Sequence, residues 1–400
     1  MVKKVTFHLP VYYLTIFNVS ACQFILTRFY PVNILSYSMK NRIIVVIIAL
    51  AAGLCQVGAI NPEQVLSKMT PCEKAGQMII VYNPDLEYLK KYPVGGVILF
   101  KGMVRDTAAV ARDLKAKQQA MKIPLLVCID QEGGNINRLG NLGKYKKTLS
   151  AKQLAEVADD SVQAIAEELT KSLNNMGINT NFAPCLDPAI NADGDTTFME
   201  VRHRSFGEDV LLISRKGKAF ARGINEQDGF SILKHFPGYD ATGNSDLNLT
   251  ESGASEAAME RFMQPFRHVI RQSNGLMMSN IIYRNLDSLP AVLSHKVVAT
   301  AREICGDKLI ITDDLWAVSV RQVVAPDLKE FKKDIPDKQF GRLVEMAVTA
   351  GNDMLLITHM GKVKVMMDAI TRLINRDAKA KGKVDAAVLR ILKLKQPLAP

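Results

Sequence analysis

The 400-residue sequence lacks features that mark several common classes of protein. It has no basic tract, although Lys and Arg outnumber Asp and Glu by 51 to 40, so nucleic-acid binding has little support. Its six cysteines show no CxxC or Cys/His spacing, so the sequence predicts no metal site. The remaining composition, 48% hydrophobic and 23% charged, is ordinary for a globular chain.

Acidic residues are absent from residues 1–59, which hold five basic residues. Within them, residues 39–59 have the basic start, apolar run and small final residues of a secretion signal. The apolar run is shorter than the ~20 residues of a membrane span. We therefore expect cleavage near Ala59, no stable span in the mature chain, and a secreted or periplasmic protein of the bacterial envelope. A retained anchor and a lipid-linked Cys55 are the alternatives, and residues 1–38 are interpreted as a non-native upstream extension.

Residues 60–400 alternate short apolar runs with amphipathic segments. Continuous apolar runs indicate strands covered on both faces, as in parallel sheets. Eight runs are found, at 77–83, 95–100, 125–130, 178–187, 230–236, 276–282, 309–314 and 353–358. Helical periodicity is found at 106–122, 150–177, 209–227, 255–273 and 338–351. This alternation predicts a single-domain α/β fold, a (β/α)8 TIM barrel. A doubly wound open sheet is the alternative, but no glycine-rich nucleotide turn follows the first strand.

Polar residues follow several of these runs, where a barrel would place a functional site. In DQEGGNINRLG (130–140), Asp130 and Arg138 flank two glycines, a pattern suited to binding sugar hydroxyls. A surface ion pair after a tight turn is the alternative. Arg204, in HRSFGED, fits the same role or a helix-capping turn.

Two further strand ends carry charged pairs. Lys234 and His235 are adjacent in KHFPG, and Asp313 and Asp314 are adjacent in IITDDLWA. Because side chains alternate along a strand, we expect one of the two aspartates to point into the barrel mouth. An ionised carboxylate there suits a nucleophile at an oxocarbenium-like centre, and the other aspartate suits a helix N-cap.

Together these motifs resemble glycoside hydrolase family 3, and most closely its single-domain bacterial β-N-acetylglucosaminidases. The likeness covers nearly all of residues 65–395 and includes EKAGQMI, VGGVILF, IPLLVCIDQEGG, NFAPCLDP, RSFGED, KHFPG, ITDDL, AGNDMLL and AVLRILKLK. It implies a TIM barrel and a retaining mechanism with Asp313 as the nucleophile. It also implies a set of residues that hold the terminal N-acetylglucosamine: Asp130, Arg138, Arg204, Lys234 and His235.

The resemblance implies no metal or organic cofactor. It implies an amino-sugar or peptidoglycan-derived glycan as the substrate. A β-glucosidase-like specificity is disfavoured by the single-domain length and the DQEGG motif.

The sequence departs from the family where the acid–base residue is expected. The subgroup carries Asp-Ser-His in the loop after KHFPG, and that histidine exchanges the proton. Here Asp246, Leu247 and Asn248 occupy this place, and Tyr239 and Asp240 replace His-Gly. Because an amide cannot exchange a proton at useful pH, we expect Asp246 to act as the catalytic acid, with Asp240 as the other acid on the loop. The alternative is a catalytically weak or inactive barrel that binds amino sugars or peptidoglycan.

Overall fold

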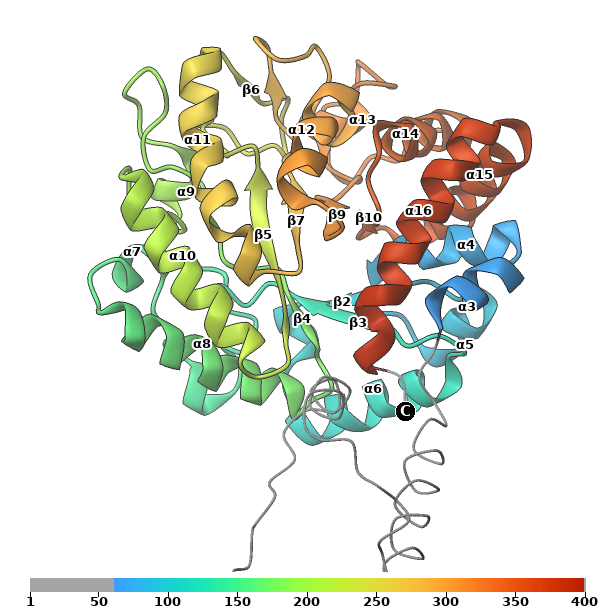
Figure 1. Cartoon of the computed structure of the whole chain (residues 1–400), viewed down its shortest axis with the longest axis horizontal. Helices are drawn as coiled ribbons and strands as arrows, with labels where there is room; N and C mark the ends of the chain where they lie inside the picture. The colour runs from blue at the N-terminus through green and yellow to red at the C-terminus, as the bar shows by residue number, and fades with distance from the viewer. Residues whose placement is uncertain (1–60, 399–400) are drawn as a thin grey trace, which may run out of the picture. The chain divides into compact units, whose positions relative to one another are not determined.

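The computed structural model describes residues 61–398 (Figure 1). The predicted upstream extension, the predicted signal peptide and its predicted cleavage site lie outside these residues. Within the described part of the chain, no helix combines the length and the apolar character needed to cross a membrane.

Eight parallel strands form one sheet in the order β10-β1-β2-β3-β4-β5-β7-β9 within residues 61–398. They are β1 Ile79–Tyr82, β2 Gly96–Leu99, β3 Leu126–Ile129, β4 Thr180–Asn181, β5 Phe230–Phe236, β7 Gly275–Met278, β9 Leu309–Thr312 and β10 Leu355–Ile357. Each lies within a predicted run or extends one residue beyond it. A parallel bridge from Ile311 to Met354 joins β9 to the segment entering β10. The TIM-barrel prediction is therefore confirmed.

The strands are buried because Val, Ile and Leu face both the barrel interior and the surrounding helices. Four predicted helices are observed close to their expected bounds: α6 Thr107–Ala120, α10 Val210–Asn225, α11 Glu256–Val269 and α14 Asp337–Ala350. In Figure 1, α10 and α11 lie along one flank of the barrel, and α14 lies beside α15 and α16 on another.

The single helix predicted over residues 150–177 is wrong, because the chain forms two helices there. Ser150 caps α7 (Ala151–Leu154) through a capping box with Gln153. Helix α8 (Asp159–Asn174) then begins afresh with two acidic residues in its first turn, which stabilise a helix N-terminus.

Further elements were not predicted from the periodicity. The α-helices are α3 Pro62–Lys68, α4 Pro71–Gln77, α5 Leu86–Lys91, α9 Phe198–Val201, α12 His295–Cys305, α13 Val318–Arg321, α15 Val363–Arg376 and α16 Ala378–Lys395. Short 3-10 turns are η3 Lys101–Met103, η4 Gly143–Tyr145, η5 Ile270–Gln272, η6 Ala291–Leu293, η7 Met360–Lys362 and η8 Gln396–Leu398. A small two-stranded sheet pairs β6 (Glu251–Ser252) with β8 (Ile282–Tyr283).

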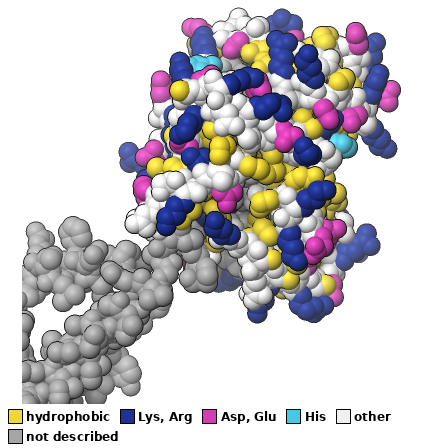
Figure 2. Space-filling model, turned by 90° about the vertical axis from the view of Figure 1, so that its right-hand side faces the viewer, with side chains coloured by type: hydrophobic (Ala, Val, Ile, Leu, Met, Phe, Trp, Pro, Cys, Tyr) yellow, Lys and Arg dark blue, Asp and Glu magenta, His cyan; other side chains and the backbone are white. Residues whose placement is uncertain are grey.

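The surface carries charges of both signs. On the face shown in Figure 2, Lys and Arg side chains are interspersed with Asp and Glu. This arrangement agrees with the absence of a basic tract from the sequence.

Candidate active site

A cavity of about 530 Å³ opens at the carboxyl ends of the barrel strands. The structure brings all the predicted site residues together on its wall: Asp130, Arg138, Arg204, Lys234, His235, Asp246 and Asp313. They come from loops after β3, β4 and β9, from the end of β5, and from the loop that follows it. Convergence at this edge is what a parallel barrel produces from residues far apart in sequence.

An ion-pair network lies on the side of the cavity formed by β3 and β5. The Nζ atom of Lys234 lies 2.7 Å from Oδ1 of Asp130 and 2.6 Å from Oε1 of Glu132. Arg204 donates to both oxygens of Glu132, from Nε at 2.9 Å and from Nη2 at 2.8 Å. The bidentate pair with Glu132 fixes the Arg204 guanidinium, and the two carboxylates hold the Lys234 ammonium between them.

Glu132 is a site residue that the sequence reasoning missed. Its signal was present in the DQEGG motif, two residues after Asp130. Burial alone would raise the pKa of its carboxyl, but Arg204 and Lys234 outweigh burial and lower that pKa to about 2. The same balance of burial against Lys234 and Arg138 lowers the pKa of Asp130. Both carboxylates are therefore ionised at neutral pH.

Arg138 completes this side of the cavity. Its Nη2 atom lies 3.4 Å from Oδ2 of Asp130. Its guanidinium also stacks over the ring of Phe100, 5.0 Å from the ring centroid. The two contacts limit how far the side chain can turn while it still borders the cavity.

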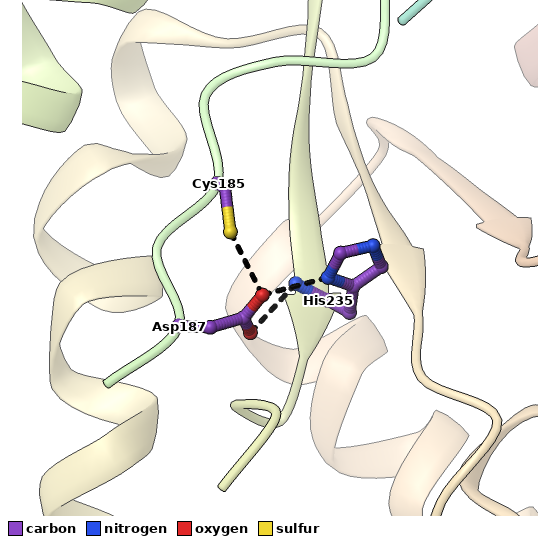
Figure 3. A group of neighbouring side chains, drawn as sticks. All are labelled: Cys185, Asp187 and His235. Atoms are coloured by element: carbon purple, nitrogen blue, oxygen red, sulfur yellow. Dashed lines mark hydrogen bonds and ion pairs between the residues drawn. The ribbon is translucent and has the colours of Figure 1, made fainter. Parts of the chain in front are cut away.

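His235 is held by a buried carboxylate, Asp187, as Figure 3 shows. Nδ1 of His235 lies 2.7 Å from Oδ2 of Asp187, and the backbone N–H of His235 donates to Oδ1 at 3.0 Å. A carboxylate can only accept here, so Nδ1 carries the hydrogen. The other ring nitrogen, Nε2, faces Arg204 and lies 3.5 Å from its Nη2 atom. Asp187, in the NFAPCLDP segment, is thus a second residue whose role the sequence reasoning missed.

Cys185, Asp187 and His235 have ligand-type atoms within 4.8 Å of one another, the spacing of a metal site. Burial and the neighbouring Asp187 raise the pKa of the Cys185 thiol well above its usual value. The thiol is therefore protonated and donates to Oδ2 of Asp187 at 2.9 Å. Since metal binding requires the thiolate, this cluster fits a hydrogen-bonded support for His235 better than a metal centre.

The side of the cavity near β9 carries carboxylates without such cations. Both Asp313 and Asp314 border the cavity, directly after β9 ends at Thr312. Asp314 accepts from the backbone N–H groups of Trp316 and Thr358, at 2.9 and 3.1 Å, so it caps a turn rather than helix α13. Burial raises the pKa of Asp314 to about 6.

Asp246 stands in the cavity near these two aspartates. The residue is exposed to solvent, which it meets inside the cavity. The protein around the cavity still removes part of the water that would surround a free carboxyl group. This desolvation, and after it the charges of Asp313 and Asp314, raise the pKa of the Asp246 carboxyl to about 7. A carboxyl group with this pKa holds a proton for a large fraction of the time at neutral pH.

Neither Asn248, at the position of the family's histidine, nor Asp240, the other acid of the loop, lines the cavity. Asn248 is exposed at the surface. Asp240 is buried behind the loop, where its Oδ2 accepts from the Ser252 hydroxyl at 2.7 Å. Burial raises the pKa of Asp240 to about 6, but its carboxyl faces β6. Of the two acids on the loop, Asp246 is the one that borders the cavity.

Residues 71–394 match the family model described as the glycosyl hydrolase family 3 N-terminal domain. The chain belongs to glycoside hydrolase family 3. This confirms the family resemblance read from the sequence, and it assigns the barrel and its cavity to a family of glycoside hydrolases.

Relatives of this chain within glycoside hydrolase family 3 match it over different lengths. The chain is 25% identical to beta-hexosaminidase LpqI of Mycobacterium tuberculosis over 84% of this chain and 86% of that protein. It is 29% identical to beta-hexosaminidase A of Pseudoalteromonas piscicida, over 53% of this chain but only 37% of that protein. The solved structure of beta-N-acetylhexosaminidase from Beutenbergia cavernae shares the fold, with a TM-score of 0.71, 24% identity, and coverage of 82% of this chain and 99% of that one.

Proposed function

We propose that the protein is a retaining glycosidase that removes terminal β-linked N-acetylhexosamine. The observation that carries the proposal is the division of one cavity into a cation-rich side and a side holding three carboxylates, one of which has a pKa of about 7. The first side suits the hydroxyl groups of a sugar, and the second supplies a nucleophile and a proton donor. Relatives named beta-hexosaminidase support an N-acetylhexosamine as the sugar.

In the first step, Asp130, Arg204, Lys234 and His235 hold the terminal sugar through its hydroxyl groups. The carboxylate of Asp313 attacks the anomeric carbon. The bond from that carbon to the leaving oxygen breaks, its electron pair passes to the oxygen, and the oxygen takes the proton of the Asp246 carboxyl. The product is a glycosyl ester on Asp313 and a free aglycone.

In the second step, the ionised Asp246 takes a proton from water. The water oxygen bonds to the anomeric carbon, and the ester bond breaks with its electron pair returning to Asp313. Asp246 is protonated again, and the sugar leaves with its original configuration. Glu132 takes no part in bond making, and it holds Arg204 and Lys234 in place.

The substrate is proposed to come from peptidoglycan fragments in the bacterial cell envelope. The secretion signal expected over residues 39–59 supports that location. The likeness to single-domain β-N-acetylglucosaminidases supports the substrate.

A second candidate function is amino-sugar binding without turnover. The observation in its favour is Asn248, which replaces the family's acid–base histidine and lies outside the cavity wall. In this alternative, the cation-rich side binds the sugar and Asp246 fails to reach the glycosidic oxygen.

An assay with 4-nitrophenyl N-acetyl-β-glucosaminide and with purified muropeptides separates the two functions. We expect the wild type to release N-acetylglucosamine from both. Asp313→Asn should lose at least about 10,000-fold in kcat, because the amide that replaces the carboxylate cannot form the ester. Wild-type turnover no faster than that of this variant would overturn the glycosidase proposal, and binding of N-acetylglucosamine by calorimetry would then support the alternative.

A further inference from the structure

The loop that carries Asp246 is fixed from inside by one tyrosine. The Tyr239 hydroxyl donates to the backbone carbonyl of Gly243 at 2.7 Å. It also accepts from the backbone N–H of Ser245 at 2.8 Å. The two partners lie three residues and one residue before Asp246, so a single side chain sets the path of the backbone that leads to it.

Tyr239 is itself anchored to the floor of the site. Its backbone N–H donates to Oδ1 of Asp187 at 2.7 Å, the same oxygen that accepts from the backbone of His235. Its ring packs against His235 and Phe198, with centroid distances of 5.9 and 6.1 Å. The side chain is only 2% exposed. The hydroxyl that holds the loop therefore projects from a fixed base.

The far side of the loop is held by the chain that follows Asp313. The backbone N–H of Val318 donates to the carbonyl of Asp246 at 3.0 Å, and that of Ser319 donates to the carbonyl of Ser245 at 3.3 Å. Both donors belong to helix α13, five and six residues beyond Asp313. The backbone at 245–246 is thus clamped between Tyr239 and the segment that bears the proposed nucleophile.

We propose that Tyr239 is a positioning residue for the proton donor, because its hydroxyl holds residues 243–246 in the conformation that presents the Asp246 carboxyl beside Asp313. The inference rests on the proposed glycosidase function. The proposal also explains how a loop that lacks the family's acid–base histidine keeps an acid in place. Tyr239 is itself a departure from the family, since Tyr239 and Asp240 stand where the subgroup has His-Gly. Tyr239 makes no contact with the reacting atoms in this account.

The removal of the hydroxyl alone tests this role. Tyr239→Phe keeps the ring but leaves the buried Ser245 N–H and Gly243 carbonyl without their partner, so the loop should shift. We expect kcat/KM for phenyl N-acetyl-β-glucosaminide, whose leaving group needs a proton, to fall about 10- to 100-fold. For the 2,4-dinitrophenyl glycoside, whose leaving group needs none, kcat/KM should change less than about threefold. The ratio kcat/KM is the measure because it reports the first step, whereas kcat also includes the second step, in which Asp246 acts as a base.

Two further variants frame the result. Asp246→Asn should show the same dependence on the leaving group with a larger loss. Tyr145→Phe is the matched control, because Tyr145 is also buried and its hydroxyl contacts Ser172 instead of the loop. It should leave both substrates unaffected. Equal losses on both substrates in Tyr239→Phe, or no loss on either, would overturn the positioning role.

Misfolding of the variant and failure of the proposed glycosidase function are told apart by two measurements, the melting temperature and the wild-type activity. If Tyr239→Phe melts more than about 10 °C below the wild type, Asn244→Ala replaces it as the test. That change removes the 3.1 Å bond from the exposed Asp246 N–H to Asn244 Oδ1 and should reproduce the leaving-group pattern. Absence of the pattern there too would overturn the role. Wild-type enzyme that cleaves neither glycoside would instead overturn the glycosidase proposal itself.

Discussion

The two sides of the cavity hold carboxyl groups in opposite electrostatic states. On the side of β3 and β5, Asp130 and Glu132 have lowered pKa values. On the side of β9, Asp314 and also Asp246, from the loop after β5, have raised ones. Desolvation raises the pKa on both sides. The difference is that Lys234 and other cations lie within hydrogen-bonding distance on the first side only. Neighbouring charge, rather than burial, therefore decides which acids can donate a proton.

Breaking the cation-rich side should have the largest effect on stability. Glu132→Gln leaves Arg204 without its carboxylate partner and leaves Lys234 with Asp130 alone, and we expect the free energy of unfolding at pH 7 to fall by about 3 kcal/mol. The Glu132 pKa is about 2, against an ordinary value of 4.5. Its contribution is therefore fully present above pH 4.5 and is lost as the pH falls toward 2. Guanidinium unfolding at pH 7 and pH 3 should show the difference from wild type narrowing at pH 3.

The matched change on the opposite side is Asp246→Asn. The raised pKa means that ionised Asp246 is less favourable in the folded chain than in the unfolded chain, so wild-type stability declines as the pH rises from about 4 to about 7. The variant should therefore unfold at the same or a higher denaturant concentration than the wild type at pH 8. Equal destabilisation by both variants would contradict the proposed division of the cavity.

The pH dependence of catalysis is the next largest expected effect. A proton donor with a pKa of about 7 loses its proton above that pH, so kcat/KM for the phenyl glycoside should fall by about tenfold per unit above pH 7. The charged groups that face Asp246 are Asp313, Asp314, Asp130 and the cation of Arg204. The dinitrophenyl glycoside should show no such fall. A profile that is identical for both glycosides would rule out Asp246 as the donor.

The smallest expected effect comes from the other acid on the same loop. Asp240→Asn keeps an acceptor for the Ser252 hydroxyl, and Asp240 does not line the cavity. We expect kcat/KM for the phenyl glycoside to change by less than about threefold, whereas loss of the general acid costs about 100-fold or more. A loss of that size in Asp240→Asn would move the donor role from Asp246 to Asp240.

Most of the barrel could be predicted from the sequence, because eight continuous apolar runs have few alternatives to a parallel sheet. The least reliable predictions concerned helix boundaries. Residues 155–158 interrupt the helix expected over 150–177 although the apolar spacing continues across them. The capping box at Ser150 and the acidic first turn at Asp159 each start a separate helix. Both signals come from polar residues, so the spacing of apolar residues does not reveal them.

The site could be predicted where the residue type and its position at a strand end were enough to indicate a role. Asp130, Lys234 and Asp313 follow strands, and the strand ends of a parallel barrel must meet. Glu132 and Asp187 were assigned no role, because a carboxylate that holds another side chain looks in sequence like any other acid. Their roles depend on partners 72 and 48 residues away, Arg204 and His235.

The order of residues was sufficient to specify the barrel, the family and the set of groups at its mouth, since these follow from local apolar pattern and chain direction. Folding alone settled which acid of the loop borders the cavity. Asp240 and Asp246 lie six residues apart on one loop, and their raised pKa values differ little. The Tyr239 hydroxyl and the backbone of α13 turn one carboxyl into the cavity and leave the other behind the loop. Such a choice depends on contacts among segments distant in the chain, which no local pattern records.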